Sequence, residues 1–123
     1  MKRRLLVLGV VVGTAAALTA TAFARHAATA KLVGTVGPGY TITLTQGGKK
    51  VTKLKAGTYA LTINDKASIH AWSLDGPNGY AKDFTKVPFI GAKTFTVNLK
   101  AGKYKYYCPP HEAMMFGHFT VAA

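Results

Sequence analysis

The sequence has few of the residues on which several protein classes depend. Its 123 residues include a single cysteine and only four acidic side chains, Asp65, Asp75, Asp83 and Glu112. One cysteine excludes an internal disulfide and a cysteine-rich zinc cluster. Four acidic residues leave little material for catalysis by paired carboxylates. A chain of this length forms one domain, and 49% hydrophobic residues are enough for a packed core.

The shortage of acidic residues leaves a large excess of positive charge. Sixteen Lys and Arg residues give a formal net charge of +12 at pH 7. Nucleic acid is a common partner of such basic chains, but the amino terminus predicts export, so we expect no nucleic acid. Two interpretations of the charge remain open. It serves solubility and retention near the anionic cell envelope, or it serves docking onto an acidic partner protein.

The amino terminus has the order of a secretory signal. The basic stretch Lys2–Arg4 precedes an apolar run, and small residues follow. Two small-x-small patterns predict cleavage after Ala24 or after Ala30. The uncharged span 5–24 is also long enough for an uncleaved anchor, but its second half consists of weakly partitioning Ala, Thr and Gly residues.

We therefore expect two parts in the chain. Residues 1–30 form a signal peptide and a short linker, and residues 31–123 form the exported domain. Removal of residues 1–24 leaves a net charge of +9, and removal of residues 1–30 leaves +8, so the mature protein is itself basic. We expect it in the periplasm, in the cell envelope or outside the cell.

From Lys31 onward, apolar and polar residues alternate with a period of two. This alternation predicts five short β-strands near residues 41–45, 59–64, 94–99, 103–108 and 119–121. Turn residues separate these runs, and no window after the signal has helical periodicity. The pattern favours an all-β fold, an antiparallel sandwich or barrel.

One short segment occurs twice. Leu54–Tyr59 reads LKAGTY, and Leu99–Tyr104 reads LKAGKY. Two copies are too few for a repeat architecture. We interpret them as one tight connection used twice, each leading a strand that begins with tyrosine into the core.

The residues best suited to metal chemistry lie near the carboxyl end. Cys108, His111 and Met115 offer a thiol, an imidazole and a thioether within eight residues. Each has an ordinary role when taken alone, but two His, one Cys and a weak axial Met form the donor set of electron-transfer copper sites. His70, which we expect at the end of a strand, can supply the second imidazole. Copper also gives a role to a lone exported cysteine, which would otherwise be an unpaired thiol.

Two segments together resemble the cupredoxins, from about residue 35 to residue 123. Cys108–His111 followed by Met115–Gly117 resembles their carboxy-terminal copper loop, and His70–Leu74 resembles their upstream histidine segment. The resemblance implies a Greek-key β-sandwich that holds one type 1 copper ion and shuttles single electrons as Cu(I) and Cu(II). The implied ligands are His70, Cys108 and His111, with Met115 axial.

The axial ligand has an adjacent competitor, Met114. The axial methionine of the family lies two residues before the glycine that opens the last strand, and Met115 has this spacing to Gly117. Met114 would then lie on an apolar rim. The chain also departs from the family, because Ala71 replaces the usual Asn after the first histidine. Since Pro109 and Pro110 have no N–H, the Cys108 sulfur should accept few hydrogen bonds, but the Ala71 N–H could reach it.

The expected function is that of an exported, monomeric electron carrier with an acidic redox partner. An enzyme is not expected, because a second copper would need further histidines and only His26 and His118 remain. Two alternatives stay open: a copper carrier or storage protein, and a secreted interaction domain without a redox role.

Overall fold

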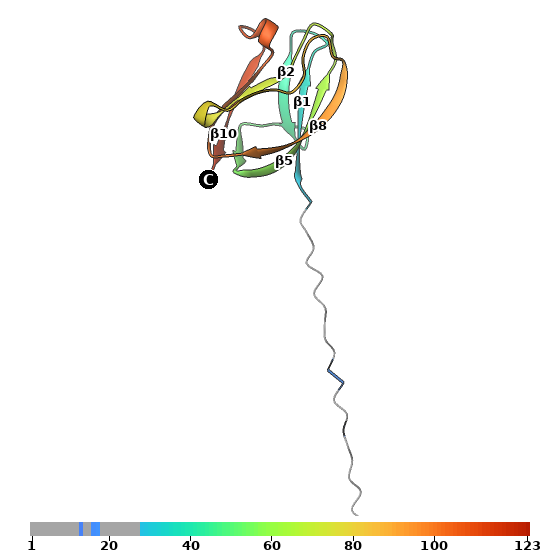
Figure 1. Ribbon diagram of the computed structural model, residues 1–123, viewed down its shortest axis with the longest axis vertical. Coiled ribbons are helices and arrows are strands. Elements are labelled where there is room, and N and C mark those ends of the chain that lie inside the picture. The colour runs from blue at the N-terminus through green and yellow to red at the C-terminus, as the bar shows by residue number, and fades with distance from the viewer. Residues whose placement is uncertain (1–12, 14–15, 18–27) are drawn as a thin grey trace, which may run out of the picture.

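Two five-stranded β-sheets pack face to face in the computed structural model, which describes residues 13, 16–17 and 28–123 (Figure 1). The first sheet has the strand order β3 (Lys49–Lys50), β2 (Ile42–Gln46), β1 (Ala30–Val36), β5 (Gly57–Asp65), β8 (Gly91–Leu99). The second has the order β4 (Lys53–Lys55), β10 (Phe116–Ala122), β9 (Gly102–Tyr107), β6 (Ser73–Asp75), β7 (Ala81–Asp83). Two short 3₁₀ turns, η1 (Pro77–Gly79) and η2 (Pro109–His111), lie between strands.

The predicted all-β sandwich is confirmed, and the five predicted strands correspond to β2, β5, β8, β9 and β10. The expectation of purely antiparallel pairing is wrong at two places, because β1 pairs with β5 and β10 with β4 in parallel. The chain leaves the first sheet after β3, adds β4 to the second sheet and returns as β5. Such crossovers, unlike hairpins, allow parallel neighbours.

The predicted signal segment lies almost wholly outside the described residues. Ala24 is among the residues not described, whereas Ala30 is the first residue of β1. Within the described part of the chain, no helix is long and apolar enough to cross a membrane.

Trp72 lies at the centre of the core between the sheets. Its fully buried indole stacks on Tyr106, with ring centroids 5.7 Å apart and planes at 5°. Gly34 makes this placement possible, because a Cβ there would come within 2.8 Å of the indole. Gly117 has the same role beside Tyr106, since a Cβ at this position would collide with the phenol ring. The glycine of the carboxy-terminal motif thus serves packing.

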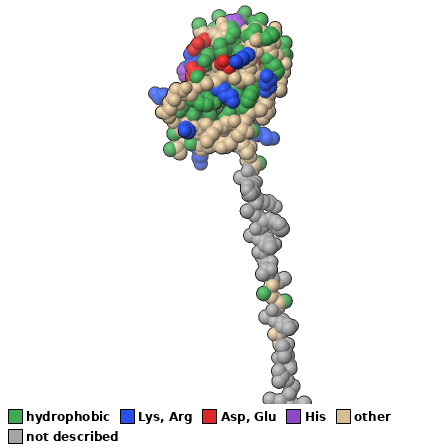
Figure 2. Space-filling model, in the orientation of Figure 1, with side chains coloured by type: hydrophobic (Ala, Val, Ile, Leu, Met, Phe, Trp, Pro, Cys, Tyr) green, Lys and Arg blue, Asp and Glu red, His purple; other side chains and the backbone are tan. Residues whose placement is uncertain are grey.

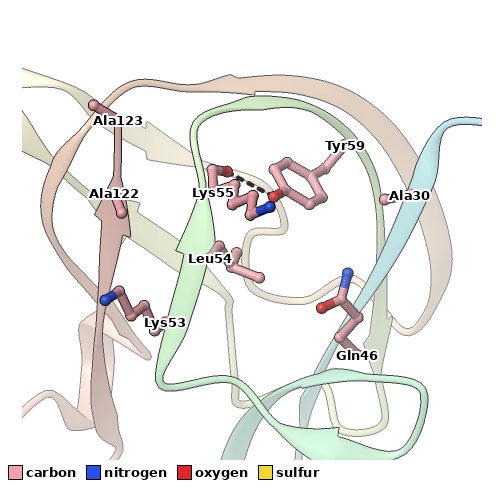
Figure 3. A pocket seen from close by; sticks show the side chains of 8 residues that line it. All are labelled: Ala30, Gln46, Lys53, Leu54, Lys55, Tyr59, Ala122 and Ala123. Atoms are coloured by element: carbon pink, nitrogen blue, oxygen red, sulfur yellow. Dashed lines mark hydrogen bonds between the residues drawn. The ribbon is translucent and has the colours of Figure 1, made fainter.

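The repeated segment forms the same tight connection twice, as predicted. The Tyr59 hydroxyl donates to the Lys55 carbonyl at 2.6 Å (Figure 3), and the Tyr104 hydroxyl donates to the Lys100 carbonyl at 2.9 Å. A glycine with positive φ begins each strand, with φ of 152° for Gly57 and 148° for Gly102. Each segment is therefore a tyrosine corner, in which the ring anchors the turn that leads into its own strand.

The two ends of the sandwich differ in what they carry. β1 begins and β10 ends at the lower end in Figure 1, whereas η2 and the β1–β2 connection lie at the upper end. The carboxy-terminal motif therefore lies at the end of the domain opposite Ala30.

We expect Tyr59→Phe and Tyr104→Phe each to lower the free energy of unfolding by about 1 kcal/mol, because each removes one hydrogen bond and leaves the ring in place. Urea unfolding of the metal-free protein measures the change. Tyr40→Phe is the control, since the Tyr40 hydroxyl has no hydrogen-bond partner among the described residues. Two tyrosine-corner variants as stable as the parent would show that the corners contribute nothing.

Candidate metal centre

Two connections at the upper end of the sandwich bring the predicted ligands together. Cys108 follows β9 directly, and His111 ends η2, so both lie on the short loop between β9 and β10. His70 lies in the connection between β5 and β6, three residues before β6 begins. Our expectation that His70 ends a strand is therefore wrong, because its segment makes a tight turn in which the His70 N–H donates to the Ala67 carbonyl.

Three donor atoms converge at this point, and we call them the donor triad: His70 Nδ1, Cys108 Sγ and His111 Nδ1. The two nitrogens are 3.2 Å apart, and the sulfur is 3.7 Å from His70 Nδ1 and 3.6 Å from His111 Nδ1. His70 and Cys108 are fully buried, whereas His111 is half-buried. Nδ1 of each ring faces the sulfur, and the buried Nε2 of His70 has no partner among the described residues.

The donor triad fits one metal ion. A point in the plane of the three atoms lies about 2.0 Å from each, which matches the metal–nitrogen and metal–sulfur distances of about 2.0–2.3 Å in protein sites. The set contains one soft sulfur, two imidazoles and no carboxylate. This chemistry suits copper better than magnesium, calcium or manganese, which prefer oxygen ligands.

Few hydrogen bonds reach the Cys108 sulfur, as expected. The Ala71 N–H donates to it at 3.4 Å, and the two prolines that follow the cysteine have no N–H to offer. A thiolate with few such bonds keeps its electron density for a metal, and these bonds tune the potential of copper sites.

The β9–β10 loop is closed by its own backbone. The Cys108 N–H donates to the Met115 carbonyl at 3.0 Å, and the Met115 N–H donates to the His111 carbonyl at 2.9 Å. Lys105 on β9 also forms an ion pair with Glu112 at 2.7 Å, although an exposed pair of this kind contributes little energy. Backbone bonds therefore fix the spacing of the three loop residues.

The two adjacent methionines occupy opposite environments. Met115 is 1% exposed and belongs to the core, whereas Met114 is 65% exposed. Burial places Met115 on the inner side of the loop. Met114 lies on the surface, where it contributes to an apolar rim.

Tyr40 is a residue of this site that sequence reasoning missed. It lies between β1 and β2, and its ring meets both His rings edge-on, with centroids 5.0 Å from His111 and 5.5 Å from His70. The Tyr40 side chain is 58% exposed, and other exposed apolar side chains lie on the connections that carry His70 and His111. We call three of these exposed side chains the apolar rim: Tyr40, Ile69 and Met114. Nothing in the local sequence connects Tyr40 to the histidines, because only the fold brings these connections together.

Charge is distributed unevenly between the two ends of the domain. The lower end, far from the donor triad, carries exposed lysines and, among the described residues, no acidic side chain. These lysines are Lys31, Lys49, Lys50, Lys53, Lys55, Lys100 and Lys103. Figure 2 shows the acidic side chains of its visible face in the upper half. The lysines Lys66 and Lys86 lie on the connections near the donor triad.

A groove of about 540 Å³ lies at the lower end and is separate from the donor triad (Figure 3). The residues that line it are Ala30, Gln46, Lys53, Leu54, Lys55, Tyr59, Ala122 and Ala123. It contains none of the predicted metal ligands.

Comparisons with known proteins agree with this geometry. A sequence model for copper-binding proteins of the plastocyanin/azurin family matches residues 41–122. Rusticyanin from Thiobacillus ferrooxidans has a similar fold, with 24% identity, 79% of each chain covered and a TM-score of 0.53. A rusticyanin structure described as a copper protein has 21% identity, 79% and 80% coverage and a TM-score of 0.57. Reduced rusticyanin has 23% identity, 79% and 81% coverage and a TM-score of 0.56. No curated protein matches the chain.

Proposed function

The chain belongs to the plastocyanin/azurin family of copper-binding proteins, and from this premise we propose that it is an exported carrier of single electrons. Copper is its cofactor. In this proposal one ion is held by His70, Cys108 and His111, with Met115 as the weak axial ligand. The observation that carries the proposal is the convergence of the donor triad in a buried position.

The environment of the donor triad suits electron transfer. Copper supplies one-electron chemistry when it is bound. Burial of His70 and Cys108 excludes water from the site, and the closed β9–β10 loop limits movement of the donors. His111 alone among the triad residues reaches the surface, and Tyr40 and Met114 lie beside it on the apolar rim. The exposed edge of His111 is therefore the proposed path for electrons.

A catalytic role has little support in the site. A second copper would need more ligands, and the donor triad contains only two histidines. His118 is exposed on β10, with its ring against Phe116 at 5.6 Å. His26 lies outside the described residues.

A copper carrier or storage protein is the alternative, and redox cycling separates it from an electron carrier. Titration with Cu(II) should produce an intense thiolate-to-copper absorption at one ion per chain. The oxidised protein should then lose and regain this absorption over repeated reduction and oxidation without loss of metal. Release of Cu(I) to a chelator on each reduction would instead indicate a carrier, and no absorption at all would refute the copper–thiolate site.

We also propose that the protein is exported and that its redox partner is acidic. The basic, apolar and small-residue order of residues 1–30 supports export to the periplasm, the cell envelope or the outside. The apolar rim, with Lys66 and Lys86 on nearby connections, suits brief docking of an acidic redox partner onto a monomer. The lysines of the lower end are too far from His111 to serve this contact and suit solubility or an anionic envelope surface.

Replacement of Cys108 by Ser should abolish the intense absorption and weaken Cu(II) binding by orders of magnitude. The serine hydroxyl is a hard donor that stays protonated at neutral pH, so it cannot replace a thiolate. His70→Ala should admit water and change the spectrum while the sandwich stays folded. Absorption spectroscopy and circular dichroism measure both effects, and a Cys108→Ser protein that stayed intensely coloured would contradict the assignment.

Met115→Leu and Met114→Leu form a matched pair that tests the axial ligand. A thioether is a weak and long axial ligand, so Met115→Leu should keep the absorption, raise the reduction potential and alter the electron paramagnetic resonance parameters. Met114→Leu should leave all three nearly unchanged, because this side chain lies on the surface. Spectral changes that follow Met114 instead would assign the axial position to it.

Electron transfer to an anionic reagent should depend on the lysines near His111. With hexacyanoferrate(III) as the oxidant, the rate should fall as the salt concentration rises, because salt screens the attraction. Lys66→Gln should lower the rate and flatten the salt dependence, whereas Lys49→Gln, at the lower end, should do neither. Stopped-flow rates that respond equally to both variants would remove the docking role from Lys66.

A further inference from the structure

A buried carboxylate near the donor triad has no cationic partner. Asp65 ends β5 and is 2% exposed, and no Lys or Arg within the described residues forms an ion pair with it. Its two oxygens accept hydrogen bonds instead, Oδ2 from the Thr85 hydroxyl at 2.9 Å and Oδ1 from the Ala67 N–H at 3.4 Å. Burial raises the pKa of Asp65, and the hydrogen bond from Thr85 opposes this rise. Burying a carboxylate without a cation costs free energy. The hydrogen bonds from Thr85 and Ala67 must therefore offset part of this cost.

The bond to Asp65 sets the direction of the Thr85 hydroxyl. A hydroxyl has one hydrogen, so a Thr85 side chain that donates to Asp65 can only accept from its other neighbours. It accepts from the Trp72 N–H at 3.0 Å. Thr85 is 1% exposed, which leaves the Trp72 amide no water as a substitute. The chain of bonds therefore runs from Trp72 to Thr85 to Asp65.

This chain of bonds ends in the segment that carries His70. Three successive amides of the segment each have a different partner: His70 N–H donates to the Ala67 carbonyl at 3.1 Å, Ala71 N–H to the Cys108 sulfur at 3.4 Å, and Trp72 N–H to Thr85. Asp65 also holds the start of the segment, through Ala67. The Ala71 side chain has no polar atom, so it adds no hydrogen bond that could hold this segment. The carboxylate thus contacts one end of the His70 turn directly, at Ala67, and is linked to the other end, at Trp72, through the Thr85 hydroxyl.

We propose that Asp65 and Thr85 are positioning residues for the donor triad. By fixing the Trp72 amide, they hold the adjacent Ala71 peptide with its N–H on the Cys108 sulfur and keep His70 Nδ1 within reach of the same point. This inference rests on the proposed ligand roles of His70 and Cys108. It adds two residues that neither bind the metal nor contact a partner.

Thr85→Val tests the role of the hydroxyl, because valine has nearly the same shape and cannot bind either neighbour. Loss of a direct outer partner of a metal ligand typically weakens metal binding about 10- to 100-fold. Thr85 acts one hydrogen bond further from the ligands, so we expect the Cu(II) affinity to fall by about 10-fold, at the lower end of this range, and the thiolate-to-copper absorption to shift. Thr85→Ser keeps the hydroxyl and should restore both. Thr94→Val is the matched control, because it removes a hydroxyl that pairs with Thr62 at 2.8 Å on the exposed face of β5 and β8.

Asp65→Asn tests the carboxylate in the same way. An amide group cannot accept two hydrogen bonds on two oxygens, so the absorption should shift in the same direction as in Thr85→Val. Asp83→Asn removes the same charge from an exposed carboxylate that accepts from Ser73, and it should cause no shift. The position of the absorption is compared here, because removing a charge would alter the potential through the electric field alone.

Hydrogen exchange in the metal-free protein gives a test that needs no copper. The Trp72 amide should be protected, and Thr85→Val should lose this protection while the amides of β5 and β8 keep theirs. A freely exchanging Trp72 amide in the parent, or a Thr85→Val protein with parental affinity and absorption, would overturn the proposal. A parent protein that binds no copper would refute the proposed function. Hydrogen exchange would then still test whether Thr85 holds the Trp72 amide, because it does not depend on copper.

Discussion

The proposed copper site depends on one constraint: three donor atoms must keep their separations while the charge of the metal changes. Cu(I) and Cu(II) prefer different geometries, so ligands that were free to move would rearrange at every transfer of an electron. The fold opposes such movement from two sides. The β9–β10 loop fixes Cys108 and His111 through backbone hydrogen bonds within the loop. The opposite connection fixes His70 through amides whose partners include the cysteine sulfur itself.

Packing below the site makes these two connections rigid. Trp72 lies two residues after His70 and is buried against Tyr106, so a large aromatic contact anchors the segment in the core. Gly34 and Gly117 leave the space that these two rings occupy. The tyrosine corners at Tyr59 and Tyr104 lie at the far end of the sandwich. The tyrosine corners, which stabilise the fold, and the donor triad thus lie at opposite ends of the same two sheets.

Local sequence patterns predicted the parts of the structure that depend on local chemistry. Alternation with a period of two located five strands, since side chains of a strand point to opposite faces. The close spacing of Cys108 and His111 identified the loop, because both donors come from one short segment. The spacing to Gly117 predicted that Met115, and not Met114, faces inward, and Met115 is the buried one of the two. The parallel pairing of β1 and β5 left no such signal, because it depends on where a distant segment returns.

Residues that act across connections could not be predicted from the sequence. Tyr40 meets the His rings only because the β1–β2 connection lies at the same end of the domain as η2. Asp65 and Thr85 are 20 positions apart. In the sequence Asp65 resembles an ordinary strand end and Thr85 an ordinary loop residue. His70 was expected at the end of a strand, but it lies in a turn whose following amides, of Ala71 and Trp72, bind the cysteine sulfur and Thr85 on distant segments.

We propose that the fold sets the donor positions before the metal binds. Crystal structures of the metal-free and the Cu(II)-loaded protein test this most directly. We predict one ion at the donor triad, with His70 Nδ1, Cys108 Sγ and His111 Nδ1 at nearly the same separations in both structures, 3.2 Å between the nitrogens and 3.6–3.7 Å from each to the sulfur. A metal-free structure in which the His70 turn or the β9–β10 loop opens, or a copper ion bound by other residues, would contradict it.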